Sequence, residues 1–478
     1  MSMETALTRR VRLRETALLA LVLCAVKLAL LALDPTVRFF LGDSASYLHS
    51  AITGWIPPDR SFLYGMLIRA TAVAAHSLYV LVLVQSLFGV LLACLLFRLL
   101  RDSFAVPRAI AGLCALALSV EPAQLFYERM AMAESAGTLA FATMLYAGFA
   151  WLRQPRWFWP LVWAFAGIVT VALRMSLLPV VLGFAVLPIA VAILVRPKGL
   201  SHSRLAAHAA VALLATAALH KGYQQLYGQL VGQRPDYIAD TGYFRLGLVA
   251  PLVTREQVLR AGLPPDLLDR VRIPLADPRA REAQIWLPEG LIAQVRDSAG
   301  SQGNKAARKL ASYALRADPA GFLRLARVTV ADYFDAGVVR ARMEDDLGTR
   351  ALEQDTLEAL RTCCNYDARG VEARRNPVAR NFAASTPWLT FCFLALLPLA
   401  VLTLAVRWHT ARAASVLLAT SIAGLVLAQT LFSHIVSFRY LHPFPFFLLL
   451  TSGALLAALG RRRATDGDGK STSASSGN

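Results

Sequence analysis

Ten long apolar stretches constrain this chain more than any other feature of its sequence. A helix that rises about 1.5 Å per residue needs roughly 17–25 apolar residues to cross the hydrocarbon core of a bilayer. The chain is 56% hydrophobic and 17% charged, whereas about one residue in four is charged in soluble domains. Stretches of sufficient length cover residues 15–33, 78–99, 107–125, 132–152, 157–173, 176–195, 205–221, 387–406, 411–432 and 443–460. The sequence therefore predicts an all-α polytopic membrane protein with about ten transmembrane helices.

Basic residues between these stretches predict how the chain is oriented. Cytoplasmic loops of membrane proteins carry an excess of Lys and Arg. If all ten stretches span the membrane, every short basic cluster falls on the side of the N-terminus: Arg9–Arg14, Arg98–Arg108, Arg153–Arg156, Arg196–Arg204, Arg407–Arg412 and Arg461–Arg463. We therefore expect a bacterial inner-membrane protein with both termini in the cytoplasm. This distribution accounts for the formal net charge of +18. The sequence has no basic face interleaved with aromatic residues, so we do not expect nucleic acid as a partner.

Two polar segments divide the chain into modules. Residues 1–222 form an N-terminal transmembrane module whose first external loop covers 34–77, and 387–463 carry the last transmembrane helices. Between them, 223–386 contains Pro-Pro and Pro-Asp breaks and amphipathic patterns, so we expect a mainly helical extracytoplasmic domain. Residues 464–478 are rich in Ser, Gly and Asp, which predicts a disordered cytoplasmic tail.

Two shorter segments carry expectations of their own. The pattern over Leu63–Ala75 predicts a helix that lies along the membrane surface. Cys363 and Cys364 are adjacent, and no Cys-x-x-Cys or Cys/His spacing suited to zinc accompanies them. We therefore predict neither a disulfide nor a metal site at these cysteines.

The first external loop holds the first group of residues that could carry chemistry. Asp43 lies in the segment Gly-Asp-Ser-Ala-Ser-Tyr, which ends at Tyr47. Arg60 and Tyr64 follow in the same loop and add a cation and a second aromatic ring. Asp before Ser is also a common helix N-cap, so Asp43 has a purely structural alternative.

A second group lies where later external connections meet apolar segments. Glu134 stands at the entry to the fourth stretch, and an acid at such a position usually faces the bundle interior or a wet cavity. Glu128 precedes Arg129, and the alternative for these two is an ordinary interfacial ion pair. Arg174 lies in the tight external turn between the fifth and sixth stretches.

A third group, His434, Arg439 and His442, precedes the last apolar stretch. Interfacial Arg residues often act only as membrane anchors, and the two histidines are alternative metal ligands. Lys27 lies within the first apolar stretch and is expected to pair within the bundle or to extend toward the surface. All three groups fall on the predicted external face. This convergence favours a reaction between a lipid-borne donor and an acceptor outside the cytoplasm, where nucleotide sugars are unavailable.

At these residues the chain resembles the GT-C glycosyltransferases, multi-spanning enzymes that use polyprenyl-phosphate sugars, including the aminoarabinose-transferase and protein-mannosyltransferase branches. The similar features are Asp43 with Tyr47, the acid Glu134, Arg439-Tyr440 with Pro443, and the stretch from Asp318-Pro319 to Tyr333-Phe334. The resemblance covers most of residues 10–222 and 387–460.

The resemblance implies inverting transfer of a hexosyl or pentosyl group from a polyprenyl-phosphate donor to a lipid, polysaccharide or protein acceptor of the cell envelope. Asp43 is then the general base, and Glu134 positions the acceptor, supports Asp43 or helps to hold a divalent cation. Arg60, Arg174 and Arg439 are expected to bind the leaving phosphate, because the planar guanidinium group can donate two hydrogen bonds to it. The full set of expected substrate-binding residues is Tyr47, Arg60, Tyr64, Glu128, Arg174, His434, Arg439 and His442.

Two other functions have similar hydropathy. A transporter or flippase of a lipid-linked precursor often shows matched repeats and places its substrate site near the bilayer midplane. No internal repeat is evident here, and the ionisable groups gather at one predicted face. A non-catalytic assembly factor for envelope polysaccharide is the third alternative. The sequence favours the transferase.

Overall fold

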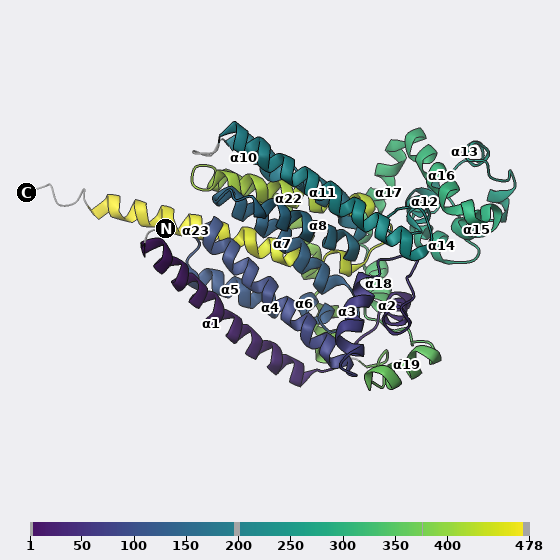
Figure 1. Ribbon diagram of the computed structural model, residues 1–478, viewed down its shortest axis with the longest axis horizontal. Helices are drawn as coiled ribbons and strands as arrows, with labels where there is room; N and C mark the ends of the chain where they lie inside the picture. The colour runs from purple at the N-terminus through teal and green to yellow at the C-terminus, as the bar shows by residue number, and fades with distance from the viewer. Residues whose placement is uncertain (1–2, 196–200, 375, 472–478) are drawn as a thin grey trace, which may run out of the picture.

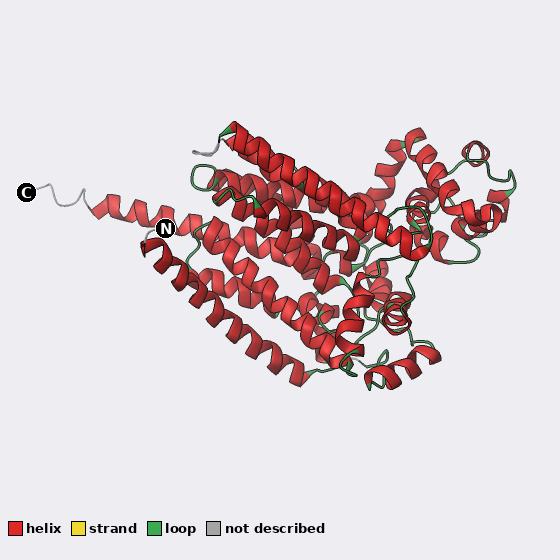
Figure 2. Cartoon of the chain, in the orientation of Figure 1, coloured by secondary structure: helices red, strands yellow, loops and turns green. Residues whose placement is uncertain are grey.

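The computed structural model describes residues 3–195, 201–374 and 376–471, and the description below refers to these residues. They form helices joined by short loops, as Figure 2 shows. The β-type pairing recorded in this part of the chain is an isolated parallel bridge between Arg38 and Met130. The prediction of an all-helical protein is therefore confirmed for the described residues.

Each of the ten predicted apolar stretches coincides with helical structure. Within the described residues, seven helical segments are long and apolar enough to cross a membrane: Val11–Leu33, Leu78–Ser103, Glu134–Arg153, Met175–Val195, His202–Val231, Thr386–Arg407 and Arg412–Phe432. Shorter apolar helices, Arg108–Ser119, Phe158–Leu173 and Phe444–Gly460, occupy the other three stretches. Helices of this length and composition support the prediction of a membrane protein.

The helices of the bundle follow one another in chain order. They are α1 (Met3–Leu33), α4 (Leu78–Ser103), α5 (Arg108–Ser119), α6 (Pro122–Tyr127), α7 (Glu134–Arg153), α8 (Phe158–Leu173), α9 (Leu178–Phe184), α10 (Leu187–Val195), α11 (His202–Val231), α21 (Thr386–Arg407), α22 (Arg412–Phe432) and α23 (Phe444–Ser471). The last helix thus continues into the predicted tail as far as Ser471, and residues 472–478 of that tail lie outside the described residues.

At one end of the bundle, the buried side chain of Asp102 pairs with three arginines. The Asp102 side chain, 1% exposed, forms ion pairs of 3.0, 2.8 and 3.1 Å with Arg12, Arg98 and Arg153. A buried carboxylate needs such compensation because its desolvation is costly. These arginines come from three of the clusters that the sequence places on one side of the membrane, and both chain termini lie toward this end (Figure 1).

The first loop folds into two short helices at the opposite end. They are α2 (Leu41–Thr53) and α3 (Leu63–Ile68), which continues as a π-helical turn over Arg69–Val73. The predicted helix at Leu63–Ala75 is therefore present over most of its length. Tyr64, Ile68 and Ala72 recur every four residues and are all buried, so this face of the helix packs against the protein.

The predicted domain of residues 223–386 consists of two parts with different cores. The first part comprises α12 (Thr241–Val249), α13 (Arg255–Arg260), α14 (Arg281–Trp286), α15 (Leu291–Ala299) and α16 (Gly303–Ala317), and it buries a hydrophobic core of its own. The second comprises α17 (Pro319–Asp332), α18 (Ala336–Asp346), α19 (Gln354–Cys364) and α20 (Pro377–Ala384). Side chains from the second part, including Tyr333, Leu347 and Phe382, join the core of the transmembrane bundle. The first part projects furthest from the bundle (Figure 1).

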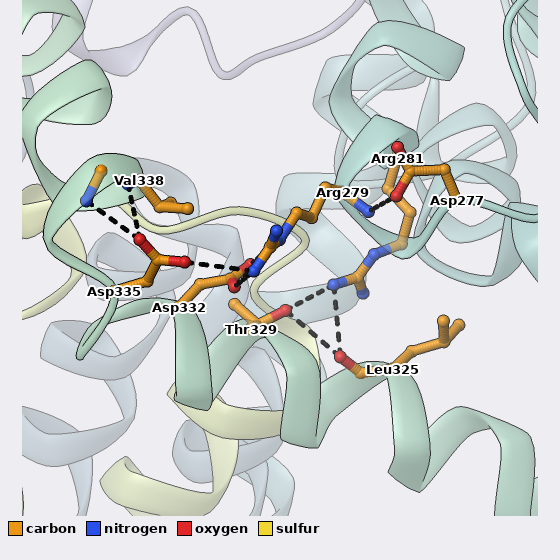
Figure 3. A network of polar contacts seen from close by, with 9 residues as sticks. Asp277, Arg279, Arg281, Leu325, Thr329, Asp332, Asp335 and Val338 are labelled. Carbon is orange, nitrogen blue, oxygen red and sulfur yellow. Dashed lines mark hydrogen bonds and ion pairs between the residues drawn. The ribbon is translucent and has the colours of Figure 1, made fainter.

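Polar contacts attach the projecting part to α17, as Figure 3 shows. Arg279 donates to both carboxylate oxygens of Asp332, at 2.7 and 3.3 Å. The buried guanidinium group of Arg281 donates to the Leu325 carbonyl and to the Thr329 hydroxyl. Asp335 caps the start of α18 by accepting from the backbone N–H groups of Gly337 and Val338. These contacts set the direction in which α18 leaves α17 and enters the bundle.

Candidate functional site

Backbone pairing brings together the segment after α1 and the segment between α6 and α7. Arg38 N–H donates to the Arg129 carbonyl, and Ala131 N–H donates to the Arg38 carbonyl, both at 2.9 Å. The Ser44 hydroxyl accepts from Phe40 N–H at 2.8 Å and donates to the Ala131 carbonyl at 3.0 Å. The start of α2 is therefore held against the segment that leads into α7. This pairing places Asp43 and Glu134, which are far apart in the sequence, in the same region.

Asp43 is the centre of an ion-pair cluster at this end of the bundle. It lies in the first turn of α2, whose N-cap is Phe40 and lacks a side-chain cap. The N-cap alternative for Asp43 is therefore wrong. Its two carboxylate oxygens meet Arg60 at 3.0 Å and Arg439 at 2.8 Å. The Asp43 side chain is 24% exposed, so a ligand can reach it.

The two arginines determine the charge state of Asp43. Burial by itself disfavours the carboxylate, but the positive charges of Arg60 and Arg439 outweigh it and hold the pKa of Asp43 below its usual value. Arg60 also contacts Asp59 at 2.5 Å. The pKa of Arg439 is well above its usual value, because neighbouring groups including Tyr440, Asp43 and Glu134 outweigh the effect of its burial. Asp43 and Arg439 are therefore both charged at neutral pH.

Aromatic rings surround the guanidinium groups. Arg60 lies 5.2 Å from the centre of the Tyr47 ring, and Arg439 lies 4.7 and 5.1 Å from the rings of Phe40 and Tyr440. Tyr47 in turn contacts Tyr64 edge-on, with ring centres 4.8 Å apart. Such cation–π contacts orient arginine side chains while leaving donors free. The predicted residues Tyr47, Arg60 and Tyr64 therefore belong to one assembly with Asp43.

Arg439 is carried by a short 3-10 turn, Phe438–Tyr440, that is fastened by residues outside the predicted site. Asp346 of α18 accepts from the Ser437 hydroxyl at 2.8 Å and from Phe438 N–H at 2.5 Å. The Tyr333 hydroxyl donates to the Ser437 carbonyl at 3.0 Å. Asp346 did not emerge from the sequence, because three consecutive acids, Glu344–Asp346, at the end of a polar helix look like a solvated face. Tyr333 fell within a noted stretch, but nothing indicated its partner.

Glu134 and Arg174 complete the charged cluster. Arg174 donates to the Arg439 carbonyl at 2.8 Å. Burial lowers the pKa of Arg174, and the neighbouring Glu134 carboxylate opposes that change. One buried polar atom on each of four site residues lacks a hydrogen-bond partner within the described chain: Arg60 Nη1, Arg174 Nη1, Arg439 Nε and Glu134 Oε2. Buried polar groups are normally satisfied, so these atoms are available to a bound ligand.

Glu128 and His442 belong to a separate buried network. Glu128 accepts from Lys27 at 2.7 Å and from the side-chain amide of Gln124 at 2.8 Å, and the side-chain oxygen Oε1 of Gln124 lies 2.9 Å from His442 Nε2. The other ring nitrogen of His442 lies 3.2 Å from the Thr138 hydroxyl. Lys27 therefore pairs within the bundle, as one of its two sequence alternatives predicts. Glu128 Oε1 and both nitrogens of His442 are engaged in this network, whereas Glu128 Oε2 is buried without a hydrogen-bond partner in the described chain.

His434 is surrounded by positive charge. Burial and the nearby guanidinium groups of Arg281, Arg439 and Arg342 lower its pKa to about 3, so the imidazole is neutral at physiological pH. Among the described residues, no group of three or more His, Cys, Asp or Glu side chains is arranged to hold a metal ion. The adjacent Cys363 and Cys364 are free thiols with their sulfur atoms 2.7 Å apart.

No protein-family model, curated protein or solved structure matches this chain. The site combines a reachable carboxylate, three guanidinium groups and a second buried carboxylate at one end of an apolar bundle. Such an arrangement suits an anionic ligand next to a proton acceptor.

Proposed function

We propose that this protein is an integral membrane glycosyltransferase of the GT-C type, which moves a sugar from a polyprenyl-phosphate donor to an extracytoplasmic acceptor of the envelope. One observation carries the proposal: the Asp43 carboxylate is held between Arg60 and Arg439, which lie almost 380 residues apart. Asp102 also pairs with several arginines, but its side chain is 1% exposed, whereas that of Asp43 is 24% exposed. Two cations around one accessible carboxylate form a site that can exchange the carboxylate for another anion.

The leaving phosphate is the anion that the guanidinium groups would take. Arg60, Arg174 and Arg439 each keep a buried N–H group that has no partner among the described residues. As the bond between sugar and phosphate breaks, negative charge grows on the phosphate, and oriented donors stabilise it. The lipid chain of the donor would lie between apolar helices, because the site is at the end of the bundle.

Asp43 would become the general base when the donor binds. While Arg60 and Arg439 hold it, its lowered pKa makes it a weak base. A donor phosphate that draws these cations away removes their stabilisation of the carboxylate, so the pKa of Asp43 rises. Asp43 can then take the proton of the acceptor hydroxyl as its oxygen attacks the anomeric carbon. General-base assistance is typically worth about 10²–10⁴-fold in rate.

Glu134 would orient the acceptor hydroxyl through its unpartnered carboxylate oxygen. Because Arg60 and Arg439 face both oxygens of Asp43, we propose that the arginines stabilise the charge of the phosphate; a divalent cation held with the help of Glu134 is the alternative.

The orientation that we propose follows from the two ends of the bundle. The arginines around Asp102 would lie in the cytoplasm with both termini, and the Asp43 site with the projecting helices would lie on the outer side of a bacterial cytoplasmic membrane. A lipid-linked donor could reach a site at the membrane surface either from the outer leaflet or from between the helices of the bundle.

The test is release of polyprenyl phosphate when purified protein is incubated with a set of polyprenyl-phosphate sugars and candidate acceptors. We expect Asp43→Asn to abolish release, since the amide cannot accept the proton. Asp59→Asn is the matched control, because it also removes a carboxylate from Arg60 but leaves Asp43 in place. Wild-type turnover by Asp43→Asn would exclude the proposed base. Transbilayer movement of the lipid without release would identify a flippase instead.

A further inference from the structure

A groove separate from the Asp43 cluster lies between α18, α20 and the first residue of α21. Its volume is about 450 Å³, within the roughly 300–1,000 Å³ range of small-molecule sites. Val339, Met343 and Leu347 of α18 and the loop after it line the groove from one side, and Ala379 and Ala383 of α20 line it from the other. We call this feature the α18–α20 groove. Its floor is apolar because these positions recur at helical spacing.

Charge marks the rim of the groove. Arg340 on α18 and Arg380 on α20 both line it and are exposed. Neither guanidinium group has a recorded ion pair or hydrogen bond with a residue that the structure describes. Glu344 also lines the groove, so the rim carries two positive charges and one negative charge. This balance suits a ligand with a single negative charge better than a dianion.

The position of the groove indicates where that ligand comes from. Thr386, which lines the groove, is the first residue of α21, one of the helices long and apolar enough to span a membrane. Trp388 and Phe391 stack in the first turns of the same helix, with ring centres 5.9 Å apart. Aromatic residues at such helix ends gather at the level of the lipid headgroups. With α21 in a bilayer, Arg340 and Arg380 would therefore lie at the level of the lipid headgroups.

We infer that the α18–α20 groove binds an anionic phospholipid of the surrounding bilayer. Arg340 and Arg380 hold its phosphodiester, and the glycerol and the first acyl methylenes lie on Val339, Met343 and Ala383. The inference does not depend on the glycosyltransferase proposal. It does have a consequence for that site, because α18 also carries Asp346, which fastens the turn of Arg439. A lipid in the groove braces the helix that positions this arginine.

The experiment measures binding of phosphatidylglycerol to the purified full-length protein by native mass spectrometry, with phosphatidylcholine as the zwitterionic comparison. Each basic residue near an anionic lipid contributes about fivefold in affinity. The double variant Arg340→Gln/Arg380→Gln should therefore bind phosphatidylglycerol about 25-fold more weakly than the wild type. Both side chains are exposed, so the variant should keep its melting temperature in the absence of lipid.

Two further variants separate a specific site from general attraction. Arg316→Gln/Arg327→Gln removes the same charge from exposed positions of α16 and α17 that do not line the groove, and it should bind like the wild type. Val339→Trp keeps both arginines but fills the groove, and it should lose the tightly bound lipid. Equal binding of phosphatidylcholine, unchanged binding by the Arg340/Arg380 variant, or stronger binding of polyprenyl phosphate than of phosphatidylglycerol at this groove would each overturn the inference.

Discussion

Replacing Asp346 by Asn tests how the site is positioned without touching a residue proposed to contact substrate. Asp346 is 2% exposed, and its two oxygens accept from the Ser437 hydroxyl at 2.8 Å and from Phe438 N–H at 2.5 Å. Asn has nearly the same shape but offers one oxygen and one NH2 group. At least one of the two donors therefore faces another donor after the substitution.

The size of the effect follows from these two hydrogen bonds. Leaving a buried polar group unsatisfied costs about 1–3 kcal/mol. The cost falls on the turn of residues 438–440, so we expect Arg439 to lose its fixed position 2.8 Å from Asp43. Misplacement of a catalytic group by about 1 Å can lower a rate by about 10²-fold. Asp346→Asn should therefore lower both the melting temperature and the rate of polyprenyl-phosphate release.

Two assays separate the structural step from the functional one. Thermal unfolding of the detergent-purified variant reports the lost hydrogen bonds, and polyprenyl-phosphate release reports the position of Arg439. Asp345→Asn is the matched control, because Asp345 belongs to the same helix but pairs with Arg342 and Arg350. A variant at position 346 with wild-type melting temperature and rate would refute the reasoning. A lowered melting temperature with an unchanged rate would leave Asp346 as a purely structural residue.

The remaining predictions concern the charged groups and the glycines that make room for them. Arg439→Ala should lower the rate of release by about 10²-fold or more, as loss of one charge-stabilising donor does. Arg439→Lys should recover only part of that rate, because one ammonium group cannot replace the guanidinium contacts to both Asp43 and Tyr440. An unchanged rate in Arg439→Ala would indicate that this residue is only a membrane anchor. Lys27→Met should destabilise the protein by about 3–5 kcal/mol, since it leaves the buried Glu128 carboxylate without its cation. The double variant Lys27→Met/Glu128→Gln should recover much of this loss in stability. Equal melting temperatures for the two variants would contradict this pairing. Gly89→Ala should lower stability because its Cβ would overlap the Glu128 carboxylate, and Gly112→Ala, where nothing lies within 4 Å, should not. Burial raises the pKa of Asp346 to about 6, so the folded protein binds this proton more tightly than the unfolded chain. The resulting stabilisation is fully present below about pH 4 and is lost as the pH rises through 6. If the melting temperature of the wild type does not fall relative to that of Asp346→Asn over this pH range, the assignment is contradicted.

Hydrophobic patterning alone determined most of the secondary structure and the class of protein. Each apolar stretch of sufficient length coincides with helical structure, because a long run without polar residues leaves the backbone few alternatives to a helix. Spacing also located the helix beginning at Leu63 and the residues that could carry charge, among them Asp43, Arg60, Glu134 and Arg439. These conclusions depend on local composition, which a single sequence contains in full.

Tertiary structure decided which of those charged residues meet. Asp43, Arg60 and Arg439 form one cluster, whereas Glu128 and His442 pair with Lys27, Gln124 and Thr138 inside the bundle. The sequence could not separate these two sets, because an acid or a histidine at a helix end looks the same whichever neighbour it faces. The division of residues 223–386 between two cores and the fastening of the Arg439 turn by Asp346 are likewise contacts between distant segments. Such contacts depend on how helices pack against one another, and no local pattern records them.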